Sequence, residues 1–217
     1  MDSTVLFLPE LILIASILAV PAIYIATNNT KSYSICSNIS LSVSLLITIL
    51  FWYYSDLVSF DKKASSFTIY DHFVIDDFSQ IFKVIFLISA LGVSLISSSY
   101  FRVDEPHQAE FYVLLLSSTL GMLIVASAND FLTIFVGIEI SAFSSYALVA
   151  FRKSDDKSSE AGAKYLLIGA FSSALTLYGI SLIYALTGSI TFEGVNAFLV
   201  GIQNGVIEGN YEELVFI

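Results

Sequence analysis

The sequence predicts an all-α integral membrane protein with six transmembrane helices and the start of a seventh. Of the 217 residues, 56% are hydrophobic and only 13% are charged, whereas a soluble domain carries about 25% charged residues. The apolar residues gather in long runs, and a run of about 20 apolar residues is long enough to cross a bilayer. Polar connections separate these runs, so we expect a single membrane domain over residues 1–217.

The first two apolar runs predict helices over residues 5–26 and 39–54. The first run follows Asp2 and contains Glu10, so it lacks the basic flank of a secretory signal. We therefore expect a retained transmembrane helix. The second run ends in four aromatic residues, 51–54, which are typical of the headgroup boundary of a membrane.

The polar connection over residues 55–77 is the longest in the first half of the sequence. The short runs FTIY at 67–70 and FVI at 73–75 favour extended structure, which predicts a short β-hairpin at the membrane surface. The next apolar run predicts a helix over residues 78–100, and we expect Asp77 to cap its N-terminus.

Three more helices are expected over residues 110–127, 131–151 and 160–186. The turn Asn129–Asp130 is so short that the fourth and fifth helices must be antiparallel neighbours. Gly188 is expected to cap the C-terminus of the sixth helix, since glycine readily adopts the left-handed conformation found there.

The last part of the sequence begins with a polar, glycine-containing connection over residues 187–210, with a short surface helix expected around 195–202. Residues 211–217 begin another apolar run that stops after a few residues. A spanning helix needs about 20 residues. We therefore expect an N-terminal portion of a longer module, either a split-gene product or a piece of a longer protein.

The charge and the side-chain inventory exclude several functions. The formal net charge is −10, and a protein without a basic patch does not neutralise nucleic-acid phosphates. Cys36 is the single cysteine, and His72 and His107 lie far apart, so the sequence offers neither an internal disulfide nor a metal-ligand cluster. It also contains no glycine-rich phosphate loop. We expect no cofactor and no metal in this chain.

The basic residues predict the orientation in the membrane. The connections after the first, third and fifth helices contain more of them than the opposite connections, so the positive-inside rule places them on the cytoplasmic or matrix side. The N-terminus is then expected on the periplasmic or intermembrane-space side. The basic residues are Lys31, Arg102, Arg152, Lys153 and Lys157 on the first side, and Lys62 and Lys63 on the other.

Glu139 is the strongest functional candidate, because it lies near the middle of an apolar run, roughly 12–18 Å from either end of its helix. An ionisable group at that depth costs roughly 2.5–3.5 kcal/mol on insertion scales. A buried carboxyl tends to take a proton unless a cation is close, so a moving cation can switch its protonation. Gly137 and the serines at 141, 144 and 145 favour close helix packing and hydrogen bonding. The alternative is a purely structural, hydrogen-bonded acid.

Lys164 is the second candidate, about one turn inside the predicted sixth helix. A lysine at this depth can extend to the interface, which is the alternative to a functional role. Small and polar residues accompany it on one face, which favours helix packing over lipid contact. They are Gly162, Gly169, Ser172, Ser173 and Gly179. We interpret the charged loop over residues 152–159 as solvated and setting topology.

Several motifs resemble the antiporter-like membrane subunits of respiratory complex I, and most of all the subunit N family, called chain 2 in mitochondria. The strongest motif is SEAGAKYLLIGAFSS at residues 159–173, followed by EFYVLLLSSTLGM at 110–122, ASAND at 126–130 and GIEI at 137–140. The resemblance is specific over about residues 110–188, and before them only the helix pattern carries it.

The resemblance implies a proton-translocating module of NADH:ubiquinone oxidoreductase, built from two inverted repeats with discontinuous helices. Glu139 matches the family's fifth-helix glutamate and Lys164 its sixth-helix lysine, on a mid-membrane proton path. The family's later lysines have no counterpart before Ile217, so a second chain or further sequence is expected to supply the remaining helices. Other membrane-arm subunits and lipids are the expected partners, while flavin, iron–sulfur clusters and quinone belong to other subunits. The expected location is the mitochondrial inner membrane, with the bacterial plasma membrane as the alternative.

Two other functions stay open at this point. The chain could belong to a multisubunit cation/proton antiporter or a membrane-bound hydrogenase, which use the same module. It could also be a structural scaffold whose proton path is incomplete.

Overall fold

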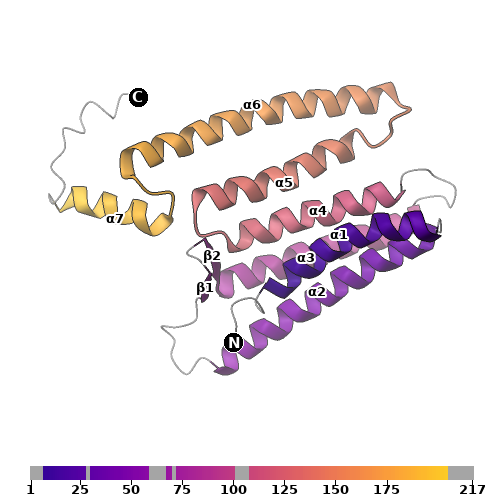
Figure 1. Cartoon of the computed structure of the whole chain (residues 1–217), viewed down its shortest axis with the longest axis horizontal. Helices are drawn as coiled ribbons and strands as arrows, with labels where there is room; N and C mark the ends of the chain where they lie inside the picture. Colours follow the sequence, from indigo (N-terminus) through magenta and orange to yellow (C-terminus); the bar gives the residue numbers. More distant parts are fainter. Residues whose placement is uncertain (1–6, 28–29, 59–66, 70–71, 101–107, 205–217) are drawn as a thin grey trace.

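The computed structural model describes residues 7–27, 30–58, 67–69, 72–100 and 108–204 (Figure 1). Six of its helices are long and apolar enough to cross a membrane, which confirms the predicted fold class. Residues 211–217, where we expected the start of another helix, lie outside the described part of the chain.

The elements follow the predicted order. The helices are α1 (Leu8–Thr27), α2 (Thr30–Val58), α3 (Asp77–Tyr100), α4 (Gln108–Ser127), α5 (Phe131–Val149), α6 (Asp156–Thr187) and α7 (Phe192–Gln203). The predicted hairpin is present as the antiparallel strands β1 (Phe67–Ile69) and β2 (Phe73–Ile75). Gly188 caps α6 in the left-handed conformation with a φ of 67°, and the short helix expected near the end is α7.

Two expectations about helix starts were wrong. The second helix begins at Thr30 and not at residue 39, because Tyr33 and Ser37 in its early turns are buried against the rest of the bundle. Ser37 in those turns lies within 3.5 Å of Ser94 on α3, at hydrogen-bonding distance. The N-cap of α3 is Asp76, not Asp77, since the Asp76 carboxylate accepts a 2.8 Å hydrogen bond from the Ser79 amide.

Helices α1 to α4 form a packed bundle, and α4 lies at its centre, in contact with α1, α2, α3 and α5. Leucines on the four helices of this bundle are fully buried in one cluster, among them Leu13, Leu41, Leu87 and Leu116. A Cβ at Gly121 of α4 would lie 2.6 Å from the Gly137 carbonyl oxygen of α5, so these helices touch backbone to backbone.

Helix α6 lies at the edge of the structure, beyond α5 (Figure 1). It packs mainly against α5 and has a smaller contact with α7. Gly162 is its buried residue, pressed against Ala150 at the end of α5. The α6 side chains therefore present a broad apolar surface.

Helices α1 to α6 alternate in direction, so the connections fall into two groups. The β-hairpin, the α4–α5 turn and the α6–α7 turn lie at one end of the molecule, at the left of Figure 1. The α5–α6 connection lies at the opposite end, as do the C-terminal ends of α1 and α3. This grouping agrees with the loop assignment made from the basic residues. The side of the membrane that each end faces stays a prediction.

Candidate functional site

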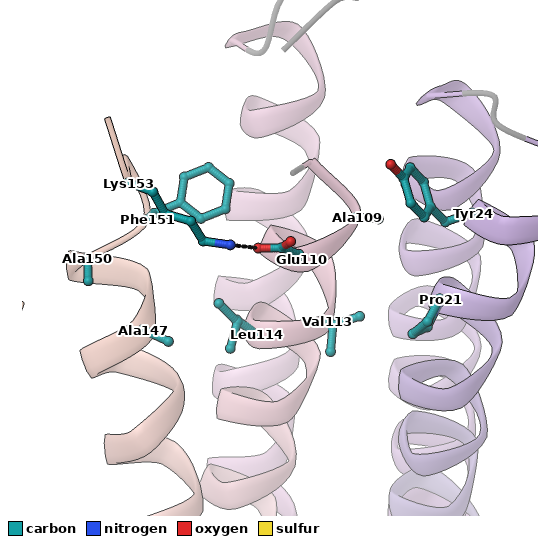
Figure 2. A pocket seen from close by; sticks show the side chains of 10 residues that line it. All are labelled: Pro21, Tyr24, Ala109, Glu110, Val113, Leu114, Ala147, Ala150, Phe151 and Lys153. Carbon is teal, nitrogen blue, oxygen red and sulfur yellow. Dashed lines mark hydrogen bonds and ion pairs between the residues drawn. The ribbon is translucent and has the colours of Figure 1, made fainter. Parts of the chain in front are cut away.

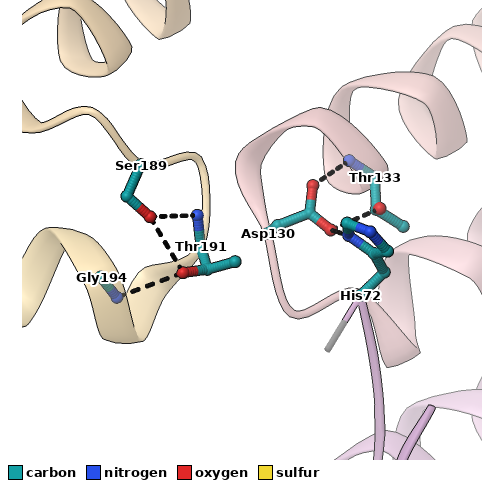
Figure 3. A network of polar contacts seen from close by, with 6 residues as sticks. All are labelled: His72, Asp130, Thr133, Ser189, Thr191 and Gly194. Carbon is teal, nitrogen blue, oxygen red and sulfur yellow. Dashed lines mark hydrogen bonds and ion pairs between the residues drawn. The ribbon is translucent and has the colours of Figure 1, made fainter. Parts of the chain in front are cut away.

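The start of α5 is fixed by Asp130, which is fully buried and caps the helix (Figure 3). Its carboxylate accepts hydrogen bonds from the Thr133 amide at 2.7 Å and the Thr133 hydroxyl at 2.6 Å, and it lies 2.9 Å from Nδ1 of His72. Burial alone would raise the pKa of Asp130, but the hydrogen bonds from Thr133 and the contact with His72 outweigh it and lower the pKa.

Backbone hydrogen bonds join this turn to two distant connections. The Asn129 amide donates to the His72 carbonyl at 2.8 Å, and the Phe131 amide donates to the Ile190 carbonyl at 3.1 Å. The α4–α5 turn is thus held between the β-hairpin and the α6–α7 connection. The position of Glu139, eight residues after Phe131 and about 12 Å along the helix, depends on this anchor.

Glu139 is half-buried on the face of α5 that meets α6. Its Oε1 accepts a hydrogen bond from the Ser173 hydroxyl of α6, at 2.5 Å. The carboxyl lines a groove of about 330 Å³ between the two helices, together with Tyr146, Tyr165 and Ser172.

The serines near Glu139 in sequence have other partners. Ser141 lies 3.1 Å from the Ser118 hydroxyl of α4, while Ser144 and Ser145 donate to carbonyls of their own helix. The hydroxyl that meets Glu139 is Ser173, for which the sequence indicated only helix packing. Ser173 is nine residues, or 2.5 turns, after Lys164, so the two lie on opposite faces of α6, and the sequence does not say which element either face meets.

Lys164 has a different partner from Glu139. Its ammonium pairs with Glu160, one turn earlier in α6, at 2.5 Å, and its side chain is 69% exposed. Ser173, which contacts Glu139, is nine positions further along α6, or about 14 Å. The pairing with Glu160 turns Lys164 toward the charged loop, which agrees with the interfacial alternative.

Two tyrosines lie between Lys164 and the Ser173–Glu139 contact along the axis of α6. The rings of Tyr146 on α5 and Tyr165 on α6 pack edge to face at 4.7 Å. The Tyr146 hydroxyl occupies the space that a Cβ at Gly169 would take, so the glycine permits this contact. Gly169 lies between Lys164 and Ser173 along α6, so the tyrosines line the part of the groove nearest the charged loop.

The sequence-based prediction missed a second buried ionisable group. Lys83 of α3 lies 2.6 Å from Glu10 of α1, and these side chains are only 1% and 6% exposed. The signal that selected Glu139, an ionisable residue inside an apolar run, was present at both positions.

Another cavity lies at the charged-loop end, between α1, α4 and the end of α5 (Figure 2). It has a volume of about 540 Å³ and is lined mainly by apolar side chains. Lys153 and Glu110 form an ion pair of 2.9 Å at its edge, with side chains 62% and 49% exposed. The cavity is an interfacial recess whose two charges neutralise each other.

A metal centre requires three or four convergent ligands. Within the residues that the structure describes, no three His, Cys, Asp or Glu side chains lie close enough to hold a metal ion.

The spanning bundle and the glutamate in the middle of α5 place the chain in the class of antiporter-like membrane proteins. The family model described as "NADH:quinone oxidoreductase/Mrp antiporter, TM" matches residues 128–215. This match covers α5, α6 and α7, the region that contains both Glu139 and Lys164.

Similar sequences and a similar solved structure indicate which family within this class the chain matches. NADH-quinone oxidoreductase subunit N of Desulfitobacterium hafniense is 52% identical over 114 residues, 52% of this chain and 23% of the relative. Subunit N of Pelagibacter ubique is 33% identical over 217 residues, all of this chain and 44% of the relative. Respiratory complex I from Thermus thermophilus with bound aureothin contains a chain of similar structure, with 27% identity and a TM-score of 0.69, over 85% of this chain and 38% of that one.

The chain belongs to the NADH-quinone oxidoreductase subunit N family. It spans 40% to 44% of the length of the relatives that match nearly all of it. These relatives come from bacteria, so the expected mitochondrial inner membrane is not supported.

Proposed function

We propose that the chain forms part of a proton-translocating membrane-arm subunit of respiratory complex I, in a bacterial plasma membrane. Relatives named as subunits of NADH-quinone oxidoreductase support this proposal. The observation that carries it is the position of Glu139, a half-buried carboxyl in the middle of a spanning helix that lines a groove. In this proposal the chain holds no redox centre, and flavin, iron–sulfur clusters and quinone bind to other subunits.

Glu139 is proposed to alternate between its protonated and ionised forms. The Ser173 hydroxyl supports both states, because a hydroxyl donates to a carboxylate and, after rotation, accepts from a protonated carboxyl. The groove between α5 and α6 gives the carboxyl access to water or to a neighbouring helix. These are the properties that a proton relay inside a membrane requires.

Lys164 is proposed to bias the protonation of Glu139 and to pass protons through water. At the separation of about 14 Å along α6 and an effective dielectric constant of about 20, the attraction is no more than about 1 kcal/mol. The bias from Lys164 is therefore small, and a stronger cation for Glu139 must come from helices outside the described residues.

We propose that further helices of the module cover α6 and the groove. The exposed face of α6 carries Leu167, Ile168 and Phe171, which suit a helix–helix or lipid contact. Members of the family are more than twice as long as this chain, which leaves room for several such helices. They come from further sequence or from a second chain, next to other membrane-arm subunits and lipids.

The substitution Glu139→Gln tests the function in the assembled complex. It keeps the size and the Ser173 contact but removes the titratable proton, so we expect proton pumping and coupled NADH:quinone turnover to fall about tenfold or more. Glu193→Gln, an exposed acid in α7, is the matched control and should pump normally. Normal pumping by assembled Glu139→Gln complex would refute the proposal and favour a scaffold role.

The description of the family model also names Mrp antiporters, which keeps a cation/proton antiporter as the second candidate. A membrane-bound hydrogenase subunit belongs to the same alternative. Mass spectrometry of the co-purifying subunits separates these functions. Flavin and iron–sulfur proteins with NADH:quinone activity indicate complex I, hydrogenase subunits indicate the hydrogenase, and small membrane subunits alone indicate an antiporter.

A further inference from the structure

We propose that Glu10 and Lys83 form a second proton-exchanging site, a hydrated ion pair buried between α1 and α3. The proposal rests on the proposed function in proton translocation and adds to it a site outside the α5–α6 groove. The ligands of this site are water and the exchanged proton.

The two side chains form a close and buried contact. The Lys83 ammonium lies 2.6 Å from Glu10 Oε1, and both side chains are more than nine-tenths shielded. An ammonium has three N–H donors and a carboxylate accepts about four hydrogen bonds, so a single mutual contact leaves most of this capacity unused.

Apart from the ion pair itself, the polar atoms of this site have no hydrogen-bond partner in the described part of the chain. Both Glu10 oxygens and Lys83 Nζ lack a hydrogen bond of normal geometry, and so does Oε1 of Gln80. Gln80 is one turn before Lys83 on the same face of α3. Buried polar atoms are nearly always satisfied by protein or by water, so this cluster favours bound water.

The neighbouring elements add hydroxyls rather than charges. On α2, the Ser44 hydroxyl donates to the Pro9 carbonyl at 3.2 Å, and Thr48 is fully buried one turn further on. The charged residue of α4, Glu110, is at the opposite end of the bundle. Asp76 and Asp77, at the start of α3, are the nearest other acids along that helix.

The pair lies at nearly the depth of Glu139. Lys83 is six residues from the start of α3, or about 9 Å, and Glu139 is eight residues from the start of α5, or about 12 Å. Both helices start at the same end of the molecule, where Phe73 pairs with Ala128. The two sites therefore lie on different sides of α4 at a similar level in the membrane.

The proposed proton exchange begins with a transfer from Lys83 to Glu10. An N–H bond of Lys83 breaks and an O–H bond of Glu10 forms, which converts the ion pair into a neutral amine and a neutral carboxylic acid. The amine then takes a proton from water on one side and the acid releases its proton to water on the other. The ion pair is restored, and one proton has crossed the site.

The double variant Glu10→Leu/Lys83→Met separates this role from a structural one. It removes both charges at similar volume, a change that buried ion pairs often tolerate in stability. We expect the complex to assemble and its proton pumping to fall about tenfold. The control Glu110→Gln/Lys153→Gln neutralises an exposed ion pair and should pump like the wild type. Normal pumping by the assembled double variant would show that the pair is only structural.

A map of the intact wild-type complex at a resolution that shows water gives an independent test. We expect ordered water within hydrogen-bonding distance of the Glu10 carboxyl and Gln80. A dry site overturns the proposal whether or not the double variant assembles. Because the Glu139→Gln variant reports on the α5–α6 groove alone, failure of the proposed function and failure of this second site give different results.

Discussion

The bundle of α1 to α4 and the pair of α5 and α6 differ in the burial of their ion pairs. In the bundle, Glu10 and Lys83 neutralise each other between buried leucines. On α6, Lys164 pairs with Glu160 of its own helix, and apolar side chains around it are exposed. The N-terminal helices share a buried core within this chain, whereas α5 and α6 present polar groups in a groove that other helices can cover.

This difference in burial determines how much stability is lost when one partner of each ion pair is removed. Removing one partner of a buried pair leaves an uncompensated charge and costs about 3–5 kcal/mol. Removing one partner of an exposed pair costs about 0–1 kcal/mol, because water solvates the remaining charge. Stability and function can therefore be separated more easily at Lys164 than at Lys83.

The largest expected effect is that of Lys83→Met alone. This change leaves the Glu10 carboxyl buried without its cation, so we expect a loss of about 3–5 kcal/mol and a strong decrease in assembled protein. The measurement is the melting temperature and the amount of complex on a native gel. The second change, Glu10→Leu, should restore both. A single variant as stable as the wild type would mean that Glu10 is not charged in the folded protein.

The six spanning helices could be predicted from sequence because length and hydropathy determine which segments enter a bilayer. Glu139 could be selected for a similar reason, since a carboxyl in the middle of an apolar run is rare. The partners could not be predicted. That Lys83 meets Glu10, and that Ser173 meets Glu139, depends on how helices pack, which periodicity within one helix does not encode.

The start of α2 could not be predicted for the same reason, because it depends on contacts between helices. The polar residues at the start of α2 looked like a break because their burial against α3 has no local signal. The junction of His72, Asp130 and Thr191 joins three connections that are far apart in sequence. It forms largely through backbone groups, which carry no side-chain pattern.

A smaller effect is expected at the contact between the bundle and α5. In Gly121→Ala, the new methyl group would meet the Gly137 carbonyl and the Ser141 amide, which are backbone atoms that cannot rotate away. We expect a loss of about 1–3 kcal/mol, measured by thermal unfolding in detergent. Gly92→Ala is the matched control, since no described atom outside its own stretch of helix lies within 4 Å of its Cβ position. It should be neutral or gain up to about 1 kcal/mol from helix propensity. Equal stability of the two variants would mean that α4 and α5 are not in backbone contact.

The smallest effect on stability is expected at Lys164. Lys164→Gln removes an exposed i,i+4 pair, so the unfolding free energy should change by about 0.5 kcal/mol or less. Pumping should nevertheless fall if the cation assists Glu139, and Lys164→Arg, which keeps the charge, should retain more activity than Lys164→Gln. Glu160→Gln serves as the control, because it breaks the same ion pair but leaves the cation in place. If Lys164→Gln and Glu160→Gln pump equally well, the lysine serves only to reach the membrane interface, and the cation that controls Glu139 lies on the helices that cover α6.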